Sequence, residues 1–543
     1  MNIFGPQQDK PEGIQGILQT KNYNQFIILD DTGNKIHEFE GAKLANKCLP
    51  GDHIKWDEKC ILELRDEHPL IVGTIECKTK YGFTKKHVPI YLFTPYNKSY
   101  PHFIVSCSHA TNLIVLVKFD QWSDNLPRGH IEKILGTSGD FEAEKEAIIW
   151  QACPYKYPKG EYIPKRLETE RKELNGFTFN IDPEGCRDID DVLTFEKLEE
   201  GWKVTITISD VAAYVESDSI VDIFASLMGQ TLYENGQPVR PMLPQQFSDE
   251  CSLFPNKISY GISLQFRWAN ERANGRGNGR GNERANERGN ERAITNIEWF
   301  ESIFKNNKSY TYEEFDKLDS EYKPILKEIA EHLVTSKESG ESMDSHGWIE
   351  QMMLFYNNEA GKLLKTAKMG ILRKQSKPLE PQSNILASAE YCLAEEDSNH
   401  YCLQSDHYAH VSSPIRRYAD LLNQRVLKLI LIQSNERYII PLAMYDMNKR
   451  AKRAKNYERD LCFLEAIQTS RKCKAILIEI KESKIKLYIP EWKKCVSVAY
   501  KKIDDTIWSM DEQRELNLEE IEINCTFNLN ARNWKEKVII NIV

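Results

Sequence analysis

The sequence lacks several features that would assign a protein to a class at once. Its 543 residues carry 72 Lys and Arg against 81 Asp and Glu, so the net charge of −9 excludes nucleic-acid binding by overall positive charge. The longest unbroken apolar runs, such as Leu113–Val117, fall far short of the roughly 18 residues that span a bilayer. The N-terminal segment has no apolar core of a secretion signal. We therefore expect a cytoplasmic protein without a membrane segment.

Cysteine usage excludes two further classes. The 13 cysteines lie between Cys48 and Cys525 at irregular spacing, and no two of them form a CxxC pair. An odd number at such spacing supports neither a disulfide framework nor a zinc finger, and it favours reduced thiols. What remains is an ordinary globular composition, 41% hydrophobic and 28% charged. At this length it predicts about three to five domains.

The order of the expected elements divides the chain into four domains. Short β-type runs separated by turn residues fill residues 1–70 and again 71–160, and they predict two small barrels of the OB type. The region 161–470 mixes strands with helices, because apolar residues recur there at three- and four-residue intervals after residue 301. Strands return in residues 471–543, which we interpret as a third small barrel. The predicted fold is a multidomain α+β protein.

Residues 270–293 form a low-complexity insertion within the third region. They repeat the tetrapeptide Asn-[Glu/Gly]-Arg-[Ala/Gly] six times and contain no apolar residue larger than Ala, so they cannot bury enough surface to fold. The flanking stretches, Gly261–Trp268 and Ile294–Phe300, are typical of strands. We interpret the repeat as a solvated loop between two strands of one domain, and an RNA-contacting arm is the alternative.

The densest group of chemically useful residues is acidic. Four aspartates fall within ten residues of the stretch NIDPEGCRDIDDV, namely Asp182, Asp188, Asp190 and Asp191. Pro183 and Gly185 interrupt regular structure between the first and the others, which predicts a turn-rich loop. Four clustered carboxylates repel one another unless a cation neutralises them, and hard oxygen ligands of this kind suit Mg²⁺.

The acidic stretch has two other interpretations, a calcium-binding loop and a solvated loop without a ligand. A calcium loop starting at Asp188 fails in detail, because Val192 stands at its fifth position and Leu193 where the sharp turn requires Gly. A purely solvated acidic loop is disfavoured because Ile189, Val192 and Leu193 have the character of partly buried residues.

A cationic motif lies far along the chain. The sequence predicts a helix over Ser413–Ile432. Ser413 would cap its N-terminus, and Pro414 would occupy the first helical position. Arg416 and Arg417 would then occupy the first turn, beside free backbone N–H groups, and form an anion site suited to phosphate. Pairing with Asp420 would account for one arginine more easily than for two. An acidic loop and a cationic helix start together fit metal-assisted cleavage of a phosphodiester.

Both motifs carry a family resemblance. The stretches IDPEGCRDIDD and SSPIRRYADL resemble the two signature stretches of the RNase II/RNB family of 3′→5′ exoribonucleases. Further stretches agree in order: Arg240–Pro244 with Cys251–Leu253, Ile349–Leu354 with Asn357, and His410. Three stretches are more similar to the eukaryotic exosome-type branch of the family than to bacterial members. They are the sequence PEGC, Pro127–His130 and Leu135–Asp140. The PIN domain of the larger exosome subunits has no counterpart here, so we expect a monomer that does not dock stably into an exosome ring.

The resemblance implies an architecture and a reaction. Residues 1–70 and 71–160 would be cold-shock-type OB barrels, 161–470 a mixed α/β RNB catalytic domain that carries the insertion, and 471–543 an S1-like OB barrel. The implied enzyme hydrolyses single-stranded RNA from its 3′ end and releases nucleoside 5′-monophosphates. It would use Mg²⁺, as two ions, with Mn²⁺ as a substitute.

The resemblance also assigns roles to residues. It makes the four aspartates the Mg²⁺ ligands and Asp190 the carboxylate that matters most for chemistry. Arg416 would hold the phosphate at the scissile bond, with Arg417 beside it on the RNA. The remaining RNA-contacting candidates are Tyr233, Tyr312, Glu350 and Glu458. For Tyr312 and Glu350, an ordinary place on a helix surface is the alternative.

Four positions depart from the family pattern. Thr207, Gln375 and Gln424 stand where the family has His, and Ser412 stands where it has Thr. None of them removes a proposed metal ligand, so they bear on positioning and turnover more than on the class of reaction. Two rival functions remain open at this point: an RNA-binding protein with a decayed nuclease centre, and a DNA exonuclease.

Overall fold

The computed structural model describes most of the chain: residues 14–65, 67–270, 292–334, 343–377, 388–468, 472–481, 484–492, 494–499, 520–527 and 538–542. Two compact units emerge, one formed by Met1–Tyr155 with Lys449–Val543 and the other by Lys156–Asn448. No helix in the described part is long and apolar enough to cross a membrane. The repeat at 271–291 lies outside the described residues, and the strands on either side of it are described up to Asn270 and from Arg292.

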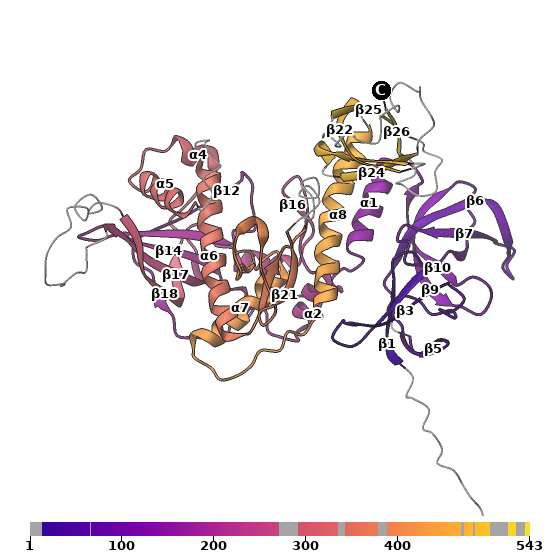
Figure 1. Ribbon diagram of the computed structural model, residues 1–543, viewed down its shortest axis with the longest axis horizontal. Helices are drawn as coiled ribbons and strands as arrows, with labels where there is room; N and C mark the ends of the chain where they lie inside the picture. The colour runs from indigo at the N-terminus through magenta and orange to yellow at the C-terminus, as the bar shows by residue number, and fades with distance from the viewer. Residues whose placement is uncertain are drawn as a thin grey trace, which may run out of the picture. The chain divides into compact units, whose positions relative to one another are not determined.

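The first unit begins with a five-stranded antiparallel sheet of order β3-β2-β1-β4-β5 (Figure 1). Its strands are β1 (Ile14–Thr20), β2 (Gln25–Leu29), β3 (Lys35–Glu40), β4 (His53–Asp57) and β5 (Lys59–Leu64). Leu18, Phe26, Ile28 and Ile54 pack together on its inner face. In β2, the more exposed Ile27 lies between the buried Phe26 and Ile28, as expected for a strand with one face in the core.

A closed barrel follows in the same unit. Its strands are β6 (Ile71–Phe83), β7 (Pro89–Pro95), β8 (Phe103–Ser106), β9 (Leu113–Gln121) and β10 (Arg128–Thr137). β10 closes the barrel by pairing antiparallel with β9 and parallel with β8. Helix α1 (Phe141–Ala152) then starts at Asp140, whose side chain accepts a hydrogen bond from the Ala143 amide. The strand order matches that of an OB barrel.

The first unit also contains the C-terminal sheet, of order β24-β23-β22-β25-β26. This order repeats that of the first sheet, with three strands in a meander and two added beside the first of them. Helix α8 (Met444–Gln468) precedes the sheet. The strands are β22 (Lys472–Lys481), β23 (Lys484–Ile489), β24 (Lys494–Ala499), β25 (Glu520–Phe527) and β26 (Val538–Ile542), with a 3-10 turn at Pro490–Trp492.

The second unit is built on a seven-stranded sheet of order β11-β18-β17-β14-β13-β12-β19. Its strands are β11 (Lys172–Glu173), β12 (Phe177–Asp182), β13 (Asp191–Lys197), β14 (Trp202–Ser209), β17 (Ile258–Asn270), β18 (Arg292–Lys305) and β19 (Lys308–Thr311). β17 and β18 pair antiparallel over most of their length. β14 is almost wholly buried because it lies at the centre of the sheet.

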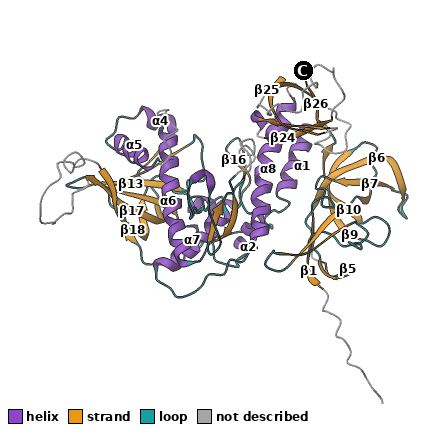
Figure 2. Ribbon diagram, in the orientation of Figure 1, coloured by secondary structure: helices purple, strands orange, loops and turns teal. Residues whose placement is uncertain are grey.

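Helices pack on this sheet and form one core with it (Figure 2). They are α4 (Tyr312–Lys317), α5 (Tyr322–Leu333), α6 (Ser345–Ala367) and α7 (Tyr418–Leu431). The helical pattern expected after residue 301 is interrupted between Lys317, where α4 ends, and Tyr322, where α5 begins. Pro324 explains the break, because proline is tolerated in the first turn of a helix but not in its interior.

Smaller elements complete the second unit. They are α2 (Ile220–Met228), β15 (Leu232–Glu234), β16 (Gln237–Arg240), α3 (Gln245–Cys251), β20 (Ile371–Lys374), β21 (Glu390–Leu393), and the 3-10 turns Val211–Ala213 and Tyr401–Leu403. The multidomain α+β architecture with several OB-type sheets and a central mixed domain is thereby confirmed. The boundaries at 70, 160 and 470 stay predictions.

Candidate functional site

The strand register gathers the acidic loop at one edge of the seven-stranded sheet. β12 ends at Asp182 and the antiparallel β13 begins at Asp191, so both carboxylates lie at the same edge. β14 ends at this edge as well, because Asp191 pairs with Ile208. On the other side of β12, the parallel strand β19 places Thr311 opposite Asp182. Four strand ends therefore converge on the loop between Asp182 and Asp191.

Each of three aspartates in this loop has a partner of its own. Asp182 Oδ2 accepts a hydrogen bond of 2.8 Å from Asn180 Nδ2. Asp188 accepts one from the hydroxyl of Tyr233. Asn180 belongs to the quoted motif but was assigned no role; it lies two residues before Asp182 and therefore on the same face of β12. This spacing of two residues in a strand is the sequence signal that indicates Asn180 as a neighbour of Asp182.

Asp190 is held by the distant cationic motif. Its side chain is 3% exposed, and its two oxygens accept hydrogen bonds from the Ile415 amide at 3.0 Å and from Arg416 Nε at 3.1 Å. Its backbone carbonyl accepts a third, at 2.8 Å, from the Ser209 amide at the end of β14. The two signature stretches thus meet in space, as the resemblance implies.

The helix expected over Ser413–Ile432 starts later than predicted. Helix α7 begins at Tyr418, and the residues before it form a turn in which the Arg416 and Arg417 amides donate to the Ser413 carbonyl. Arg417 has an extended backbone and pairs with Gln230. The arginines therefore do not sit in the first helical turn, so the anion site that free helical N–H groups were expected to form is wrong. The pairing with residue 230 also explains how Tyr233 comes beside the loop.

The two arginines point to different partners. Arg416 remains 46% exposed at the side chain while it contacts Asp190. Arg417 Nη2 pairs with Asp420 Oδ1 at 2.8 Å, and that carboxylate, fully buried, also accepts from the Ser413 amide. The pairing with Asp420 that was weighed for one arginine is thus made by Arg417. Arg416 is the arginine that reaches the acidic loop.

Burial dominates the electrostatics of the acidic loop. It raises the pKa of Asp190 to about 7, and Arg416 only partly opposes this effect. The pKa of Asp191 is raised well above its usual range by burial and by the charges of Asp182 and Asp190. Burial also raises the pKa of Asp182. These carboxylates are therefore costly to ionise together unless a positive charge joins them.

The side chains of the acidic loop are of the type that binds a hard cation, but they are not arranged around a cation site in this structure. Carboxylate oxygens are the ligands that Mg²⁺ and Mn²⁺ prefer, and burial raises the pKa of Asp190 and Asp191 despite the opposing charge of Arg416. Among the described residues, however, no three His, Cys, Asp or Glu side chains stand in an arrangement that would hold a metal ion as they are. Asp188 and Asp190 are turned toward Tyr233 and Arg416 instead.

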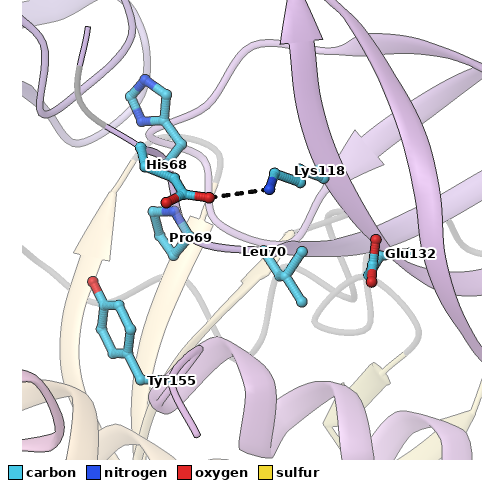
Figure 3. A pocket seen from close by; sticks show the side chains of 7 residues that line it. His68, Pro69, Leu70, Lys118, Glu132 and Tyr155 are labelled. Carbon is cyan, nitrogen blue, oxygen red and sulfur yellow. Dashed lines mark hydrogen bonds and ion pairs between the residues drawn. The ribbon is translucent and has the colours of Figure 1, made fainter. Parts of the chain in front are cut away.

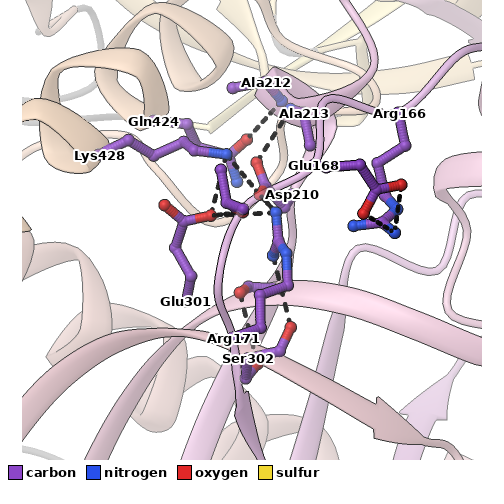
Figure 4. A network of polar contacts seen from close by, with 12 residues as sticks. Arg166, Glu168, Arg171, Asp210, Ala212, Ala213, Glu301, Ser302, Gln424 and Lys428 are labelled. Carbon is purple, nitrogen blue, oxygen red and sulfur yellow. Dashed lines mark hydrogen bonds and ion pairs between the residues drawn. The ribbon is translucent and has the colours of Figure 1, made fainter.

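A buried charge network supports the same sheet edge (Figure 4). Asp210, fully buried, accepts from Arg171 Nη2 at 2.6 Å and from Lys428 Nζ at 2.7 Å, and Glu301 pairs with the same two cations. Gln424, also on α7, donates to the Ser209 carbonyl at 2.6 Å. Because Ser209 in turn donates to Asp190, this network fixes α7 against the acidic loop.

Tyr312 and Glu350 lie on neighbouring elements. Tyr312 opens α4 directly after Thr311, beside Asp182, and its ring centroid is 5.0 Å from that of His346 on α6. Glu350 is exposed on α6 one turn beyond His346, hence on the same face. Glu458 is exposed on the part of α8 that belongs to the first unit. All the predicted site residues except Glu458 therefore lie in the second unit.

The four positions that depart from the family pattern make polar contacts in the second unit, three of them buried and that of Gln375 exposed. Thr207 shares a hydrogen bond of 2.7 Å with Ser263. Gln375 accepts from the Cys402 amide, and Ser412 accepts from Asn357 on α6. Gln424 is part of the network at Asp210. These contacts support the packing around the acidic loop and do not involve its carboxylates.

A pocket of about 390 Å³ lies in the first unit, apart from this chemistry (Figure 3). His68, Lys118, Glu132 and Tyr155 are among its lining residues. His68 Nε2 lies 3.0 Å from Oδ1 of the buried Asp52, and Lys118 pairs with Glu67 at 3.0 Å. These two side chains are therefore already engaged, and we place the candidate site in the second unit.

Comparison with known proteins agrees with this placement. Residues 171–321 and 381–433 match the RNB domain, and residues 90–153 match the Dis3-like cold-shock domain 2 (CSD2). Ribonuclease R of Buchnera aphidicola is 25% identical over 444 residues, which cover 64% of this chain and 58% of that protein. The chain thus spans less than two thirds of the length of this relative.

Two solved structures share the fold. Apo RNase R of Mycoplasma genitalium superposes with a TM-score of 0.68 at 17% identity, over 98% of this chain and 100% of that one. Yeast Ssd1, a pseudonuclease, gives a TM-score of 0.63 at 16% identity, over 90% and 79% of the two chains. The second unit thus contains the residues that match an RNB domain, and the chain is similar to proteins of the RNase II/RNB family. Residues 90–153, which include β8–β10 and α1, are similar to the Dis3-like cold-shock domain.

Proposed function

We propose that the protein is a hydrolytic 3′→5′ exoribonuclease that degrades single-stranded RNA to nucleoside 5′-monophosphates. The observation that carries the proposal is the contact between Asp190 and Arg416 at the edge of an RNB-domain sheet. It joins clustered carboxylates to a half-exposed guanidinium, which is the pairing that phosphodiester hydrolysis requires. RNase R of Mycoplasma genitalium, which shares the fold, has been solved with ribose-methylated single-stranded RNA.

The residues of the site divide the work. Asp182, Asp188, Asp190 and Asp191 would hold Mg²⁺, or Mn²⁺ in its place, which when bound supplies an activated water and neutralises the leaving oxygen. Arg416 would release Asp190 and bind the phosphate, since its planar fork suits that anion. Tyr233 and Tyr312 offer aromatic faces on either side of the loop for stacking on bases.

The test uses 5′-labelled RNA and DNA oligomers of one sequence, incubated with Mg²⁺ or with EDTA. Laddering from the 3′ end of RNA alone, only with the metal, supports the proposal. Degradation of the DNA oligomer would replace it with a DNA exonuclease. Release of nucleoside 5′-monophosphates, resolved by thin-layer chromatography against 3′-monophosphate standards, distinguishes hydrolysis at the expected bond from other cleavage.

The second candidate function is RNA binding without cleavage. Asp188 and Asp190 are engaged by Tyr233 and Arg416, and yeast Ssd1, a pseudonuclease, shares the fold. Against it, the loop keeps four carboxylates whose mutual repulsion a binding protein has no use for. A protein that retards RNA in a gel shift yet leaves it intact in Mg²⁺ and in Mn²⁺ would establish this second function.

A further inference from the structure

A buried arginine in the second unit lacks a counter-ion. Arg373 lies on β20 and is 7% exposed, and its guanidinium carbon sits 4.4 Å above the ring of Tyr391, its register partner on β21. Within the described ranges, no carboxylate lies in ion-pair distance of it, and its Nε has no hydrogen-bond partner. Burying an unpaired guanidinium is costly, so the position calls for an anion.

Arg417 adds a second guanidinium to the same cluster. Burial raises the pKa of Tyr391 and of Tyr408, and the charges of Arg373 and Arg417 oppose this rise, in agreement with the 4.4 Å contact of Arg373 with the Tyr391 ring. The Arg373 amide also donates to the Tyr408 carbonyl at 2.8 Å. We define these four residues, together with Asp420, as the 373 cluster. Two guanidiniums and one carboxylate leave it with a charge of about +1.

Polar atoms inside the 373 cluster are left unsatisfied. In the described structure, Arg417 Nε and Asp420 Oδ2 are buried without hydrogen-bond partners, as Arg373 Nε is. Asp420 Oδ1 is already shared by Arg417 and the Ser413 amide, and Asp420 Oδ2 makes no hydrogen bond to either guanidinium. A tetrahedral oxyanion would accept hydrogen bonds from the free Nε–H groups of Arg373 and Arg417 and neutralise the excess positive charge, but it would not satisfy Asp420 Oδ2.

We propose that the 373 cluster is a phosphate subsite, distinct from the acidic loop, that binds a backbone phosphate of the RNA next to the one held by Arg416. The proposal rests on the proposed function for the identity of the phosphate. Arg416 and Arg417 are consecutive, with α-carbons about 3.8 Å apart, and their side chains go to Asp190 and Asp420 respectively. The turn before α7 would therefore contact two neighbouring phosphates, one through Arg416 and one through Arg417.

The test compares the full-length wild type with R373Q, R373K and the control K374Q. Lys374 is the next residue of β20, pairs with the exposed Glu396 at 3.5 Å, and loses the same charge outside the 373 cluster. Affinity for a ten-nucleotide single-stranded RNA in EDTA is measured by fluorescence anisotropy over a range of salt concentrations. We expect about tenfold weaker binding by R373Q and a salt slope reduced by about one, an intermediate effect for R373K, and no change for K374Q.

Thermal melting with inorganic phosphate as the probe separates this inference from the proposed function. Phosphate should raise the melting temperature of the wild type and of K374Q but not of R373Q, whether or not the wild type degrades RNA. Equal salt slopes for wild type and R373Q would overturn the proposal. So would an equal phosphate effect on both proteins, or an R373K variant that binds RNA like R373Q and melts as low, because the arginine would then be structural.

Discussion

Asp190 and Asp210 are two buried aspartates that flank the same short piece of sheet, yet their environments differ. Asp210 is surrounded by Arg171 and Lys428, and their charges hold its pKa below the usual range despite burial. Asp190 has one half-exposed arginine, and burial raises its pKa to about 7. Buried carboxylates are usually paired, so the incomplete pairing at Asp190 is the unusual case.

The difference separates structure from function. At Asp210, charge is fully compensated inside the protein and stabilises the attachment of α7 to the end of β14. At Asp190 and Asp191, negative charge is left uncompensated, which costs stability and favours binding of a cation.

Asp190→Asn should abolish RNA degradation, lowering the single-turnover rate by about 10³-fold or more, which is at least about 4 kcal/mol in the barrier. The substitution keeps the size of the side chain but removes one negative charge from the proposed cation site. RNA binding, measured by gel shift, should stay equal or become slightly tighter because repulsion of the phosphate falls. A variant that degrades RNA at the wild-type rate would show that Asp190 has no part in the chemistry.

Asp210→Asn should instead destabilise the fold, by about 3–5 kcal/mol, because it leaves the buried Arg171 and Lys428 with Glu301 as their one shared counter-ion. Urea unfolding measures the loss. The matched control is Asp406→Asn, which removes an ion pair to Lys365 of similar length, 2.8 Å, at the surface and should cost about 1 kcal/mol or less. Equal losses in the two variants would contradict a structural role for the buried network.

The two sites should also respond to pH in opposite directions. Between about pH 4 and 7 the folded protein keeps a proton on Asp190 that the unfolded chain has released, so stability falls as pH rises through this window. In EDTA, we expect the wild type to lose about 2 kcal/mol between pH 5 and 7 and Asp190→Asn to lose less. Ionised Asp210 stabilises the folded protein at pH values above its pKa in the unfolded chain. This contribution is lost only as the pH falls through the lower pKa that Asp210 has in the folded protein. Parallel curves for wild type and Asp190→Asn from pH 5 to 7 would refute the raised pKa of Asp190.

Arg416→Lys should reduce turnover about tenfold, because lysine keeps the charge but loses the planar fork that reaches both carboxylate and phosphate. The control is Arg187→Lys, at an exposed arginine of the same acidic loop, for which we expect no change. Single-turnover decay of labelled RNA is the measurement. An unaffected Arg416→Lys rate would mean that the turn before α7 does not contact the scissile phosphate.

Replacing residues 271–291 with a short Gly/Ser linker should have the smallest effect, leaving activity and melting temperature nearly unchanged. These residues lie outside the described ranges, and the strands beside them, β17 and β18, pair along most of their length. Closing a long loop costs little more than closing a short one. A loss of activity of about tenfold or more would favour the alternative that the arginines of the repeat contact RNA.

Much of the architecture could be predicted from sequence because alternation and turn residues are local signals. Two small β-domains were expected within residues 1–160, and the structure has a five-stranded sheet and a closed barrel there. The start of α7 was misplaced because Ser413 and Pro414 also suit a turn, and the pairing of Arg417 with Gln230 decided between the two. That pairing joins segments far apart in sequence, where local propensity carries no information.

The candidate site divides in the same way. The meeting of Asp190 with Arg416 was implied by the family resemblance, since neither motif alone indicates its partner. The roles of Asn180 and of the Ile415 amide depend on strand register and on a tight turn. The Asp210 network was not foreseen, because its charges come from four segments with no motif in common.

The central claim is that the uncompensated carboxylates at the sheet edge bind a divalent cation, and direct titration tests it. Mn²⁺ binding to the metal-free protein at pH 8 is measured by electron paramagnetic resonance for the wild type and for Asp191→Asn. We predict saturable binding by the wild type and at least about tenfold weaker binding by the variant, because one hard oxygen ligand loses its charge. Equal binding by the two proteins, or no binding by the wild type, would contradict the claim.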